Sequence, residues 1–234
     1  MLFRQLFDKE SSTYTYLIAS GQGREALIID PVKGQTNAYL GLINQLDLKL
    51  VRAIDTHTHA DHVTALGDLR DHTGCVTIMG EFTKAECVSQ HVSEGESVNV
   101  DGVRLDALYT PGHTDESFSF VLDGSGERQR AVFTGDVLLI RGSGRTDFQG
   151  GDPYKSYDSI VNKLFTLGDN TLVYPAHDYK GFTVSSIAEE RKHNPRLAGK
   201  SAEEYAEIMR NLDLPDPAMM DVAVPANLAC GRAA

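Results

Sequence analysis

A cluster of histidines directly after an apolar segment is the feature that most constrains this chain. The segment LVRAID is followed by His57, His59, Asp61 and His62, four ligand-type side chains within six positions. In extended backbone alternate side chains share a face, so His57, His59 and Asp61 can point the same way. Imidazole nitrogens and carboxylate oxygens are ligands of first-row metals, whereas the competing interpretation is an ordinary polar loop. The pattern therefore predicts a preformed metal site at the end of a strand.

Three further ligand-type residues follow strand-like segments downstream. His113 comes after a Pro-Gly turn, Asp136 comes after Gly135 at the end of an apolar segment, and His177 follows TLVYPA. Taken singly, each would be an ordinary loop histidine or a capping aspartate. Together they place five of the eight histidines in loops at strand ends, which indicates one shared site. Three histidines do not lie in such strand-end loops and are expected at the surface: His72, His91 and His193.

The alternation of short apolar segments with turn signals indicates an α/β protein. Strands are expected over residues 13–19, 25–30, 50–56, 75–80, 103–110, 117–123, 130–136 and 171–177. Helical periodicity predicts helices over 36–46, 156–167 and 201–212, the last with a capping box of Ser201 and Glu204. Two strands precede the first helix and paired strands recur in mid-chain. This order favours two mixed β-sheets flanked by helices over a parallel doubly wound sheet.

Length and composition favour one globular domain over residues 1–234. The 234 residues are 41% hydrophobic and 24% charged, enough for one sizeable core. From about residue 213 the proline-rich end is expected to be an irregular tail. A formal charge of −11 and the lack of a Lys/Arg cluster argue against nucleic-acid binding. No basic leader with a long apolar run is evident, so no membrane association and a cytoplasmic location are expected.

The three cysteines do not suggest a disulfide framework or a zinc site. Cys75, Cys87 and Cys230 are odd in number, far apart and without a CxxC pair. We expect them to be small buried hydrophobic residues.

The order HxHxDH, then a distant histidine, an aspartate and a final histidine resembles the metallo-β-lactamase superfamily. That resemblance implies an αββα sandwich with metal at the rim between two sheets. Longer segments, FTGDVLLIRGSGRTDFQGGD, YPAHDYKGFTVSSIAEERKHNPRL and VPANLACG, resemble the persulfide dioxygenases of the ethylmalonic encephalopathy protein type. In that family a mononuclear iron(II) oxidises glutathione persulfide with O2 and water to sulfite and glutathione.

The resemblance also implies roles for particular residues. By position, His57, His113 and Asp136 would hold one iron per chain as two histidines and one carboxylate, a set that leaves three coordination positions open. Tyr179 and Arg196 match the glutathione-binding tyrosine and arginine of the family. Four ligand-type residues remain, for which we expect roles in orienting ligands and water, or direct metal binding: His59, Asp61, His62 and His177.

The loop after Asp136, LIRGSGRTDF, has neither glycine pattern of a phosphate-binding loop. We expect Arg141, Arg145 and Asp147 to fix this loop through charge-assisted hydrogen bonds, with substrate contact as the alternative. Ser143 stands where some relatives carry cysteine. Cys230 matches a cysteine of the family tail, for which packing is expected and a redox role is the alternative.

Two other functions compete with the dioxygenase. A hydroxyacylglutathione hydrolase of the glyoxalase II type would use all seven ligand positions for two metals, although only 57 residues follow His177. A catalytically silent scaffold should have lost ligands, and none is lost. Coenzyme A persulfide is an alternative substrate.

Because no rhodanese domain is present, a separate rhodanese or sulfide-oxidising enzyme is an expected partner. The chain is expected to be a monomer or homodimer.

Overall fold

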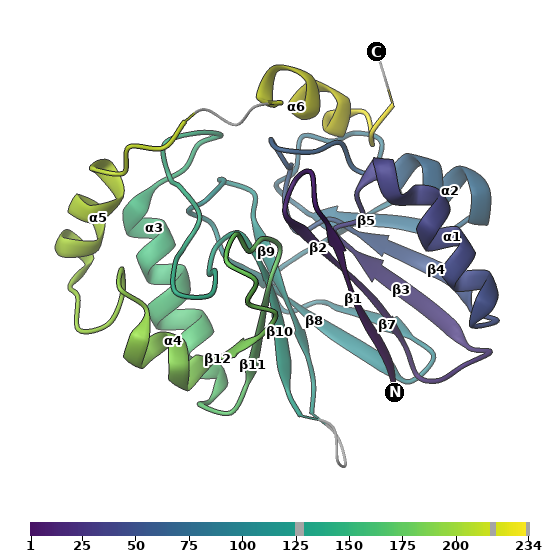
Figure 1. Cartoon of the computed structure of the whole chain (residues 1–234), viewed down its shortest axis with the longest axis horizontal. Coiled ribbons are helices and arrows are strands. Elements are labelled where there is room, and N and C mark those ends of the chain that lie inside the picture. Colours follow the sequence, from purple (N-terminus) through teal and green to yellow (C-terminus); the bar gives the residue numbers. More distant parts are fainter. Residues whose placement is uncertain (125–128, 216–218, 233–234) are drawn as a thin grey trace. The chain divides into compact units, whose positions relative to one another are not determined.

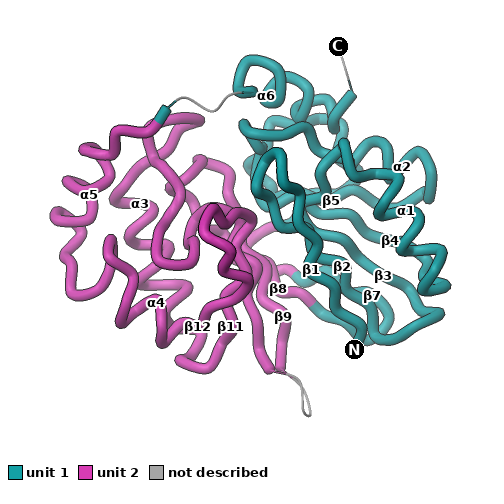
Figure 2. Tube along the Cα trace, in the orientation of Figure 1, with its two compact units in different colours: residues 1–92, 97–104, 215–234 teal, residues 93–96, 105–214 magenta. Residues whose placement is uncertain are grey.

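The chain divides into two compact units. The computed structural model describes residues 1–124, 129–215 and 219–232. Unit 1 comprises Met1–Val92, Ser97–Arg104 and Pro215–Ala234, and unit 2 comprises Ser93–Glu96 and Leu105–Leu214 (Figure 2). The organisation as one domain over residues 1–234 stays a prediction.

The first sheet is mixed, with strand order β1-β2-β3-β4-β5-β6 (Figure 1). Antiparallel pairing joins β1, β2 and β3, and parallel pairing joins β3 to β4, β4 to β5 and β5 to β6. The strands are β1 Leu2–Asp8, β2 Thr13–Ala19, β3 Glu25–Ile29, β4 Lys49–Ile54, β5 Val76–Gly80 and β6 Gln90–Val92. Because β3 and β4 are parallel neighbours, their carboxyl ends meet at one edge, where the histidine motif begins.

Two helices pack on the first sheet and close the core of unit 1. Helix α1, Thr36–Gln45, buries Tyr39 and Ile43, which are four positions apart and therefore lie on one face. Helix α2, Leu66–Thr73, buries Leu66 and Leu69 and ends at Gly74 in the left-handed conformation. These side chains share a hydrophobic cluster with strand residues such as Ile28.

The second sheet is also mixed, with strand order β12-β11-β10-β9-β8-β7. The β10–β11 pair is parallel, whereas β8–β9, β9–β10 and β11–β12 are antiparallel. Its strands are β7 Ser97–Val100, β8 Val103–Tyr109, β9 Phe118–Leu122, β10 Ala131–Gly135, β11 Leu172–Pro175 and β12 Ser185–Ser186. Two mixed sheets flanked by helices, the architecture expected from the sequence, are thus confirmed.

The helices of unit 2 begin at clear sequence signals. Helix α3, Pro153–Asp158, has Asp152 as its N-cap, and it continues into a π-helical turn, Ser159–Lys163, and a 3-10 turn, Leu164–Leu167. Helix α4 spans Ile187–His193. Helix α5, Ala202–Arg210, starts with the predicted capping box of Ser201 and Glu204. Side chains from these segments form one hydrophobic cluster with strand residues of the second sheet.

The expected irregular tail contains a helix, so that expectation is wrong for the described part of it. Helix α6 spans Met220–Leu228 and includes Pro225, a residue that disfavours helix interiors because it lacks an N–H. The helix buries Ala223 and Asn227, so tertiary contacts outweigh the local propensity. The proline-based prediction of irregular structure failed because the sequence pattern does not show the tertiary packing of this segment.

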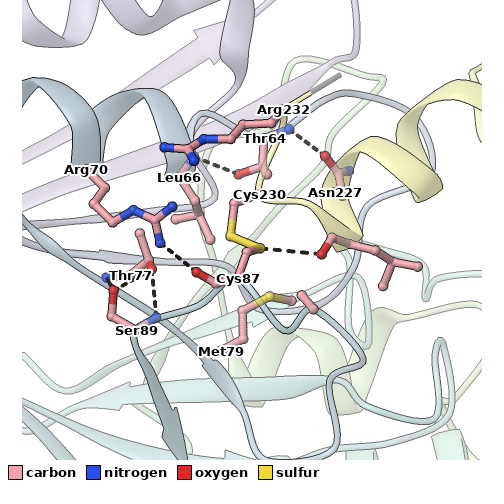
Figure 3. Close-up of a disulfide and its surroundings, with 12 residues drawn as sticks. Thr64, Leu66, Arg70, Thr77, Met79, Cys87, Ser89, Asn227, Cys230 and Arg232 are labelled. Carbon is pink, nitrogen blue, oxygen red and sulfur yellow. Dashed lines mark hydrogen bonds between the residues drawn. A yellow bond between two sulfur atoms is a disulfide. The ribbon is translucent and has the colours of Figure 1, made fainter. Parts of the chain in front are cut away.

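The cysteine expectation is wrong for two of the three residues. Cys87 and Cys230 form a disulfide (Figure 3), with their Cα atoms 5.9 Å apart and a sequence separation of 143. No local spacing marks this pair, because the fold alone brings the β5–β6 loop and the end of α6 together. Cys75 is a buried free thiol in the core of unit 1, as expected. Among the described residues, no helix is both long and apolar enough to cross a membrane.

Candidate metal centre

A buried carboxylate, Asp30, organises the start of the histidine motif. It follows β3 with φ of 51°, a left-handed conformation that aspartate tolerates better than most residues. Its Oδ1 accepts a hydrogen bond from the backbone N–H of Thr56 at 2.7 Å, and its Oδ2 accepts from Thr56 Oγ1 at 3.1 Å. Burial raises the pKa of the Asp30 carboxyl, and the nearby His57 and the bonds from Thr56 oppose that rise. Asp30 therefore fixes the backbone from which His57 projects.

The same hydrogen bonds define which nitrogen of His57 can take a metal. The Thr56 hydroxyl has one hydrogen, which it donates to Asp30, so it accepts from His57 Nδ1 at 2.9 Å. This places the proton of His57 on Nδ1 and its lone pair on Nε2. A protonated distal nitrogen with an acceptor is the usual arrangement behind a metal-binding histidine.

The rest of the motif forms a compact group in unit 1. His59 Nε2 lies 3.3 Å from Asp30 Oδ1, and His62 Nδ1 lies 3.1 Å from Asp61 Oδ2. The ring centroids of His57 and His59 are 4.2 Å apart, as are those of His59 and His62. Donor atoms of His59, Asp61 and His62 all lie within 4.8 Å of one another, which is also the spacing of a metal site.

In unit 2, the other predicted ligands converge at the carboxyl ends of β10 and β11. His113 Nε2 lies 3.6 Å from Asp136 Oδ2, a spacing at which both atoms can reach one ion with bonds of about 2.0–2.2 Å. His177 Nδ1 donates to Asp136 Oδ1 at 2.7 Å. His113 Nδ1 lies 2.7 Å from the carbonyl of Arg145, which can only accept, so the lone pair of His113 is on Nε2.

The loop after Asp136 packs so closely on these ligands that it needs a glycine. The N–H of Gly144 donates to the carbonyl of Asp136 at 2.7 Å. A Cβ at Gly144 would lie 2.3 Å from that carbonyl oxygen and 2.7 Å from His113 Nδ1. Any side chain there would displace Asp136 or His113.

Charge-assisted hydrogen bonds hold this loop, as the sequence predicted. Glu190 on α4 accepts from the Arg141 N–H at 2.8 Å and from the Arg141 guanidinium. Asn194 Nδ2 donates to Glu190 Oε2 and to the carbonyl of Gly142, both at 2.9 Å. Arg145 and Asp147 form a bidentate pair at 2.7 and 2.8 Å. These contacts bear out the expected structural role of Arg141, Arg145 and Asp147.

The two candidate glutathione-binding residues have different environments. Tyr179 is 71% exposed, and its ring stacks on His177 with centroids 6.2 Å apart and planes 5° apart. Arg196 is half-buried and donates to the carbonyl of Ser143, whose Oγ also accepts from Tyr205 at 2.9 Å. No ion pair among the described residues involves Arg196, and burial lowers the pKa of its guanidinium. A carboxylate ligand would therefore suit this arginine.

Sequence reasoning named the ligand-type residues and missed the groups that orient them. His57, His59, Asp61 and His62 lie in unit 1, and the other five candidates lie in unit 2: His113, Asp136, His177, Tyr179 and Arg196. Asp30 was detectable, because it ends a predicted strand as the named ligands do. Glu190 carried no such signal, because its charged partner, Arg141, is 49 residues away. The three histidines expected at the surface are exposed: His72, His91 and His193.

Comparison with known proteins agrees with this constellation. Residues 8–177 match the model of the metallo-beta-lactamase superfamily. The mitochondrial persulfide dioxygenase ETHE1 of Mus musculus is 47% identical over 232 residues, covering 99% of this chain and 89% of the mouse protein. The chain belongs to the persulfide dioxygenase family of the metallo-β-lactamase superfamily.

Other similarities place the chain within this superfamily. The crystal structure of ETHE1 from Myxococcus xanthus has a TM-score of 0.94 and 53% identity, covering 99% of this chain and all of that one. The hydroxyacylglutathione hydrolase GloC of Haemophilus influenzae is 32% identical over 200 residues, covering 76% of this chain and 90% of the hydrolase. The expected metallo-β-lactamase fold and persulfide dioxygenase family are thus confirmed, and the hydrolase is the more distant relative.

Proposed function

We propose that this persulfide dioxygenase acts on glutathione persulfide, which it oxidises with O2 and water to sulfite and glutathione. The observation that carries the proposal is identity of 47% along nearly the whole chain to a persulfide dioxygenase. The reaction is balanced as one persulfide, one O2 and one water giving one thiol, one sulfite and two protons. One iron(II) per chain is the proposed cofactor.

We assign the iron to His57, His113 and Asp136, the ligand set that the family resemblance implies. The hydrogen bonds described above support this choice, because both histidines direct Nδ1–H to an oxygen acceptor and carry the lone pair on Nε2. Two imidazoles and one carboxylate suit iron(II) in oxygen-using enzymes. When bound, the metal would supply redox activation of O2 and of the substrate sulfur.

The remaining four candidates would orient these ligands and form the polar walls of the site. His59 bonds Asp30, the residue that fixes Thr56 and through it His57. His177 bonds Asp136 and so sets the direction of its carboxylate. His62 and Asp61 pair with each other. Such outer contacts typically change metal affinity about 10–100-fold.

Arg196 and Tyr179 would bind the glutathione part of the substrate. The guanidinium can bind a carboxylate of glutathione, and its bond to Ser143 holds it in place before substrate arrives. The exposed phenol of Tyr179 can hydrogen-bond the peptide, and its ring is oriented by stacking on His177.

Oxygen uptake tests the proposed reaction directly. Protein purified without added metal should hold about one iron per chain, and the iron-loaded protein should consume about one O2 per glutathione persulfide while forming sulfite. No oxygen consumption by the loaded protein would rule the proposal out.

A thioester hydrolase is the second candidate. The observation that favours it is the complete set of donors His59, Asp61 and His62, spaced as in a metal site, in a chain 32% identical to a hydroxyacylglutathione hydrolase. Two metals per chain and rapid hydrolysis of S-lactoylglutathione would reverse the order of the two functions.

Replacement of Arg196 should raise the KM for glutathione persulfide more than the KM for other persulfides. We expect Arg196→Ala to raise the KM for glutathione persulfide about 10–100-fold, the equivalent of one charged hydrogen-bonding contact. A small alkyl persulfide without a carboxylate should show a much smaller change in KM. Arg191→Ala, which removes an exposed arginine paired with Asp169, is the matched control. Equal losses for both substrates would contradict a role in glutathione binding.

We place the reaction in the cytoplasm and expect the persulfide to come from a separate rhodanese or sulfide-oxidising enzyme. We expect the chain to act as a monomer or a homodimer. Coenzyme A persulfide is the alternative substrate, which the Arg196→Ala comparison also addresses.

A further inference from the structure

The disulfide of unit 1 holds the end of the chain beside the histidine motif. Cys230 follows α6 and is 1% exposed, whereas Cys87 in the β5–β6 loop is half-buried (Figure 3). The carbonyl of Cys87 also accepts from Arg70 Nη1 at 2.6 Å. Cys87 is therefore the more exposed residue of this pair.

The residues after α6 fit closely against the turn that follows His62. The N–H of Gly67 donates to the carbonyl of Cys230 at 3.0 Å, and a Cβ at Gly67 would lie 2.5 Å from that oxygen. A Cβ at Gly231, which has φ of 77°, would lie 2.0 Å from the carbonyl oxygen of Thr64. The lack of side chains at both positions permits this approach.

Asn227 on α6 connects this segment to the metal-binding motif. Its Nδ2 donates to the carbonyl of His59 at 2.8 Å and to the carbonyl of His62 at 2.9 Å. Its Oδ1 accepts from the N–H of Thr64 at 2.8 Å. The side chain is 4% exposed and uses both amide hydrogens and its oxygen on one turn. Asn227 therefore fixes the backbone of the motif from a position more than 160 residues away.

We propose that Asn227 is a positioning residue for the metal-binding motif and that the Cys87–Cys230 disulfide is the latch that keeps it in place. Reduction of the disulfide would loosen the segment after α6, weaken the three bonds of Asn227 and speed metal loss. This inference rests on the metal site proposed above, and it adds control of that site by thiols.

The chemistry of the latch is ordinary thiol–disulfide exchange. A low-molecular-weight thiolate attacks Sγ of Cys87, the S–S bond breaks, and Cys230 leaves as a thiolate that takes up a proton. A second thiol then displaces Cys87 from the mixed disulfide. The balance is two thiols oxidised to one small disulfide while the protein disulfide is reduced to two cysteines. Glutathione, the thiol product of the proposed reaction, belongs to this chemical class.

Hydrogen exchange and metal release test the latch. We compare oxidised protein, protein treated with dithiothreitol, and Cys87→Ser. The reduced protein and the variant should show about 10-fold faster exchange at the amides of Thr64 and Gly67, while the amide of Asp30, bonded to Ile54 within the sheet, stays unchanged. Release of iron to a chelator should be about 10–100-fold faster. Cys75→Ala keeps the disulfide and should respond to dithiothreitol as the unmodified protein does.

Clear results would overturn the proposal. Equal exchange and metal release in oxidised and reduced protein would show that the disulfide is no latch. A response of Cys87→Ser to dithiothreitol would show that the reductant acts elsewhere. If the unmodified protein binds no metal, the proposed function fails, and the exchange rates at Thr64 and Gly67 still decide whether the latch exists.

Substitution of Asn227 tests its positioning role separately. Asn227→Asp keeps the acceptor for Thr64 but replaces the two donated bonds with repulsion from the carbonyls of His59 and His62. We expect iron release to be about 10–100-fold faster in Asn227→Asp and Asn227→Ala, with circular dichroism and the KM for persulfide retained. Asn162→Asp, on an exposed helical turn, is the matched control. Unchanged metal release in both Asn227 variants would refute the role.

Discussion

Asp136→Ala is expected to lose nearly all bound metal and to lower kcat/KM for glutathione persulfide by about 10³-fold or more, since a metal ligand supplies several kcal/mol of transition-state stabilisation. Asp136 would provide the only anionic ligand of the proposed triad. Its Oδ2 lies 3.6 Å from His113 Nε2, and its Oδ1 accepts from His177 at 2.7 Å. Removing the carboxylate therefore removes a ligand and leaves two imidazoles without their shared partner. Metal content per chain and steady-state oxygen uptake measure both effects.

Two further variants serve as controls for the Asp136→Ala prediction. Asp169→Ala removes an exposed carboxylate paired with Arg191, and it should keep metal and activity. His177→Ala removes the bond that orients Asp136 and should cost about 10–100-fold in metal affinity, less than loss of the ligand itself. Full metal content and activity in Asp136→Ala would refute the proposed ligand set. Equal losses in Asp136→Ala and His177→Ala would instead indicate that His177 binds metal.

The sequence correctly predicted elements whose signals lie within a few neighbouring residues. The segment TYTYLIA predicted a strand over residues 13–19, and β2 spans those residues. The capping box of Ser201 and Glu204 identified the start of α5, because both partners lie within one turn. Ligand-type residues at strand ends were visible for the same reason, since the strand and the residue after it are adjacent in the chain.

The sequence did not predict contacts between residues that are far apart in the chain. The Cys87–Cys230 pair and the contacts of Asn227 each join segments that are more than 140 residues apart. Pro225 argued against a helix locally, and the packing of α6 outweighed it. Residues 141–147 were correctly expected to be fixed by charged groups, but their main acceptor, Glu190, lies on a helix that the sequence did not predict. The contacts by which Glu190 and Asn227 support the ligands are therefore ones that no local pattern reveals.

Glu190→Ala is expected to lower the free energy of unfolding by about 3–5 kcal/mol, because it removes one partner of a buried ion pair. The Glu190 side chain is fully buried. Its carboxylate accepts from Arg141, from Ser185 Oγ at 2.5 Å and from Asn194 Nδ2 at 2.9 Å. In the variant these donors lose their common acceptor inside the protein. Urea unfolding, followed by circular dichroism, measures the change.

The neighbouring glutamate provides a matched control for this prediction. Glu189 also pairs with Arg141, at 3.2 Å, but its side chain is 52% exposed. Glu189→Ala should therefore cost less than about 1 kcal/mol, as exposed ion pairs do. Glu190→Ala should in addition lower activity under conditions where it is still folded, because the loop held by Arg141 carries the carbonyl of Arg145 that orients His113. Similar stability losses in the two alanine variants would show that the buried network does not hold this loop, and the orientation of His113 would then need another source.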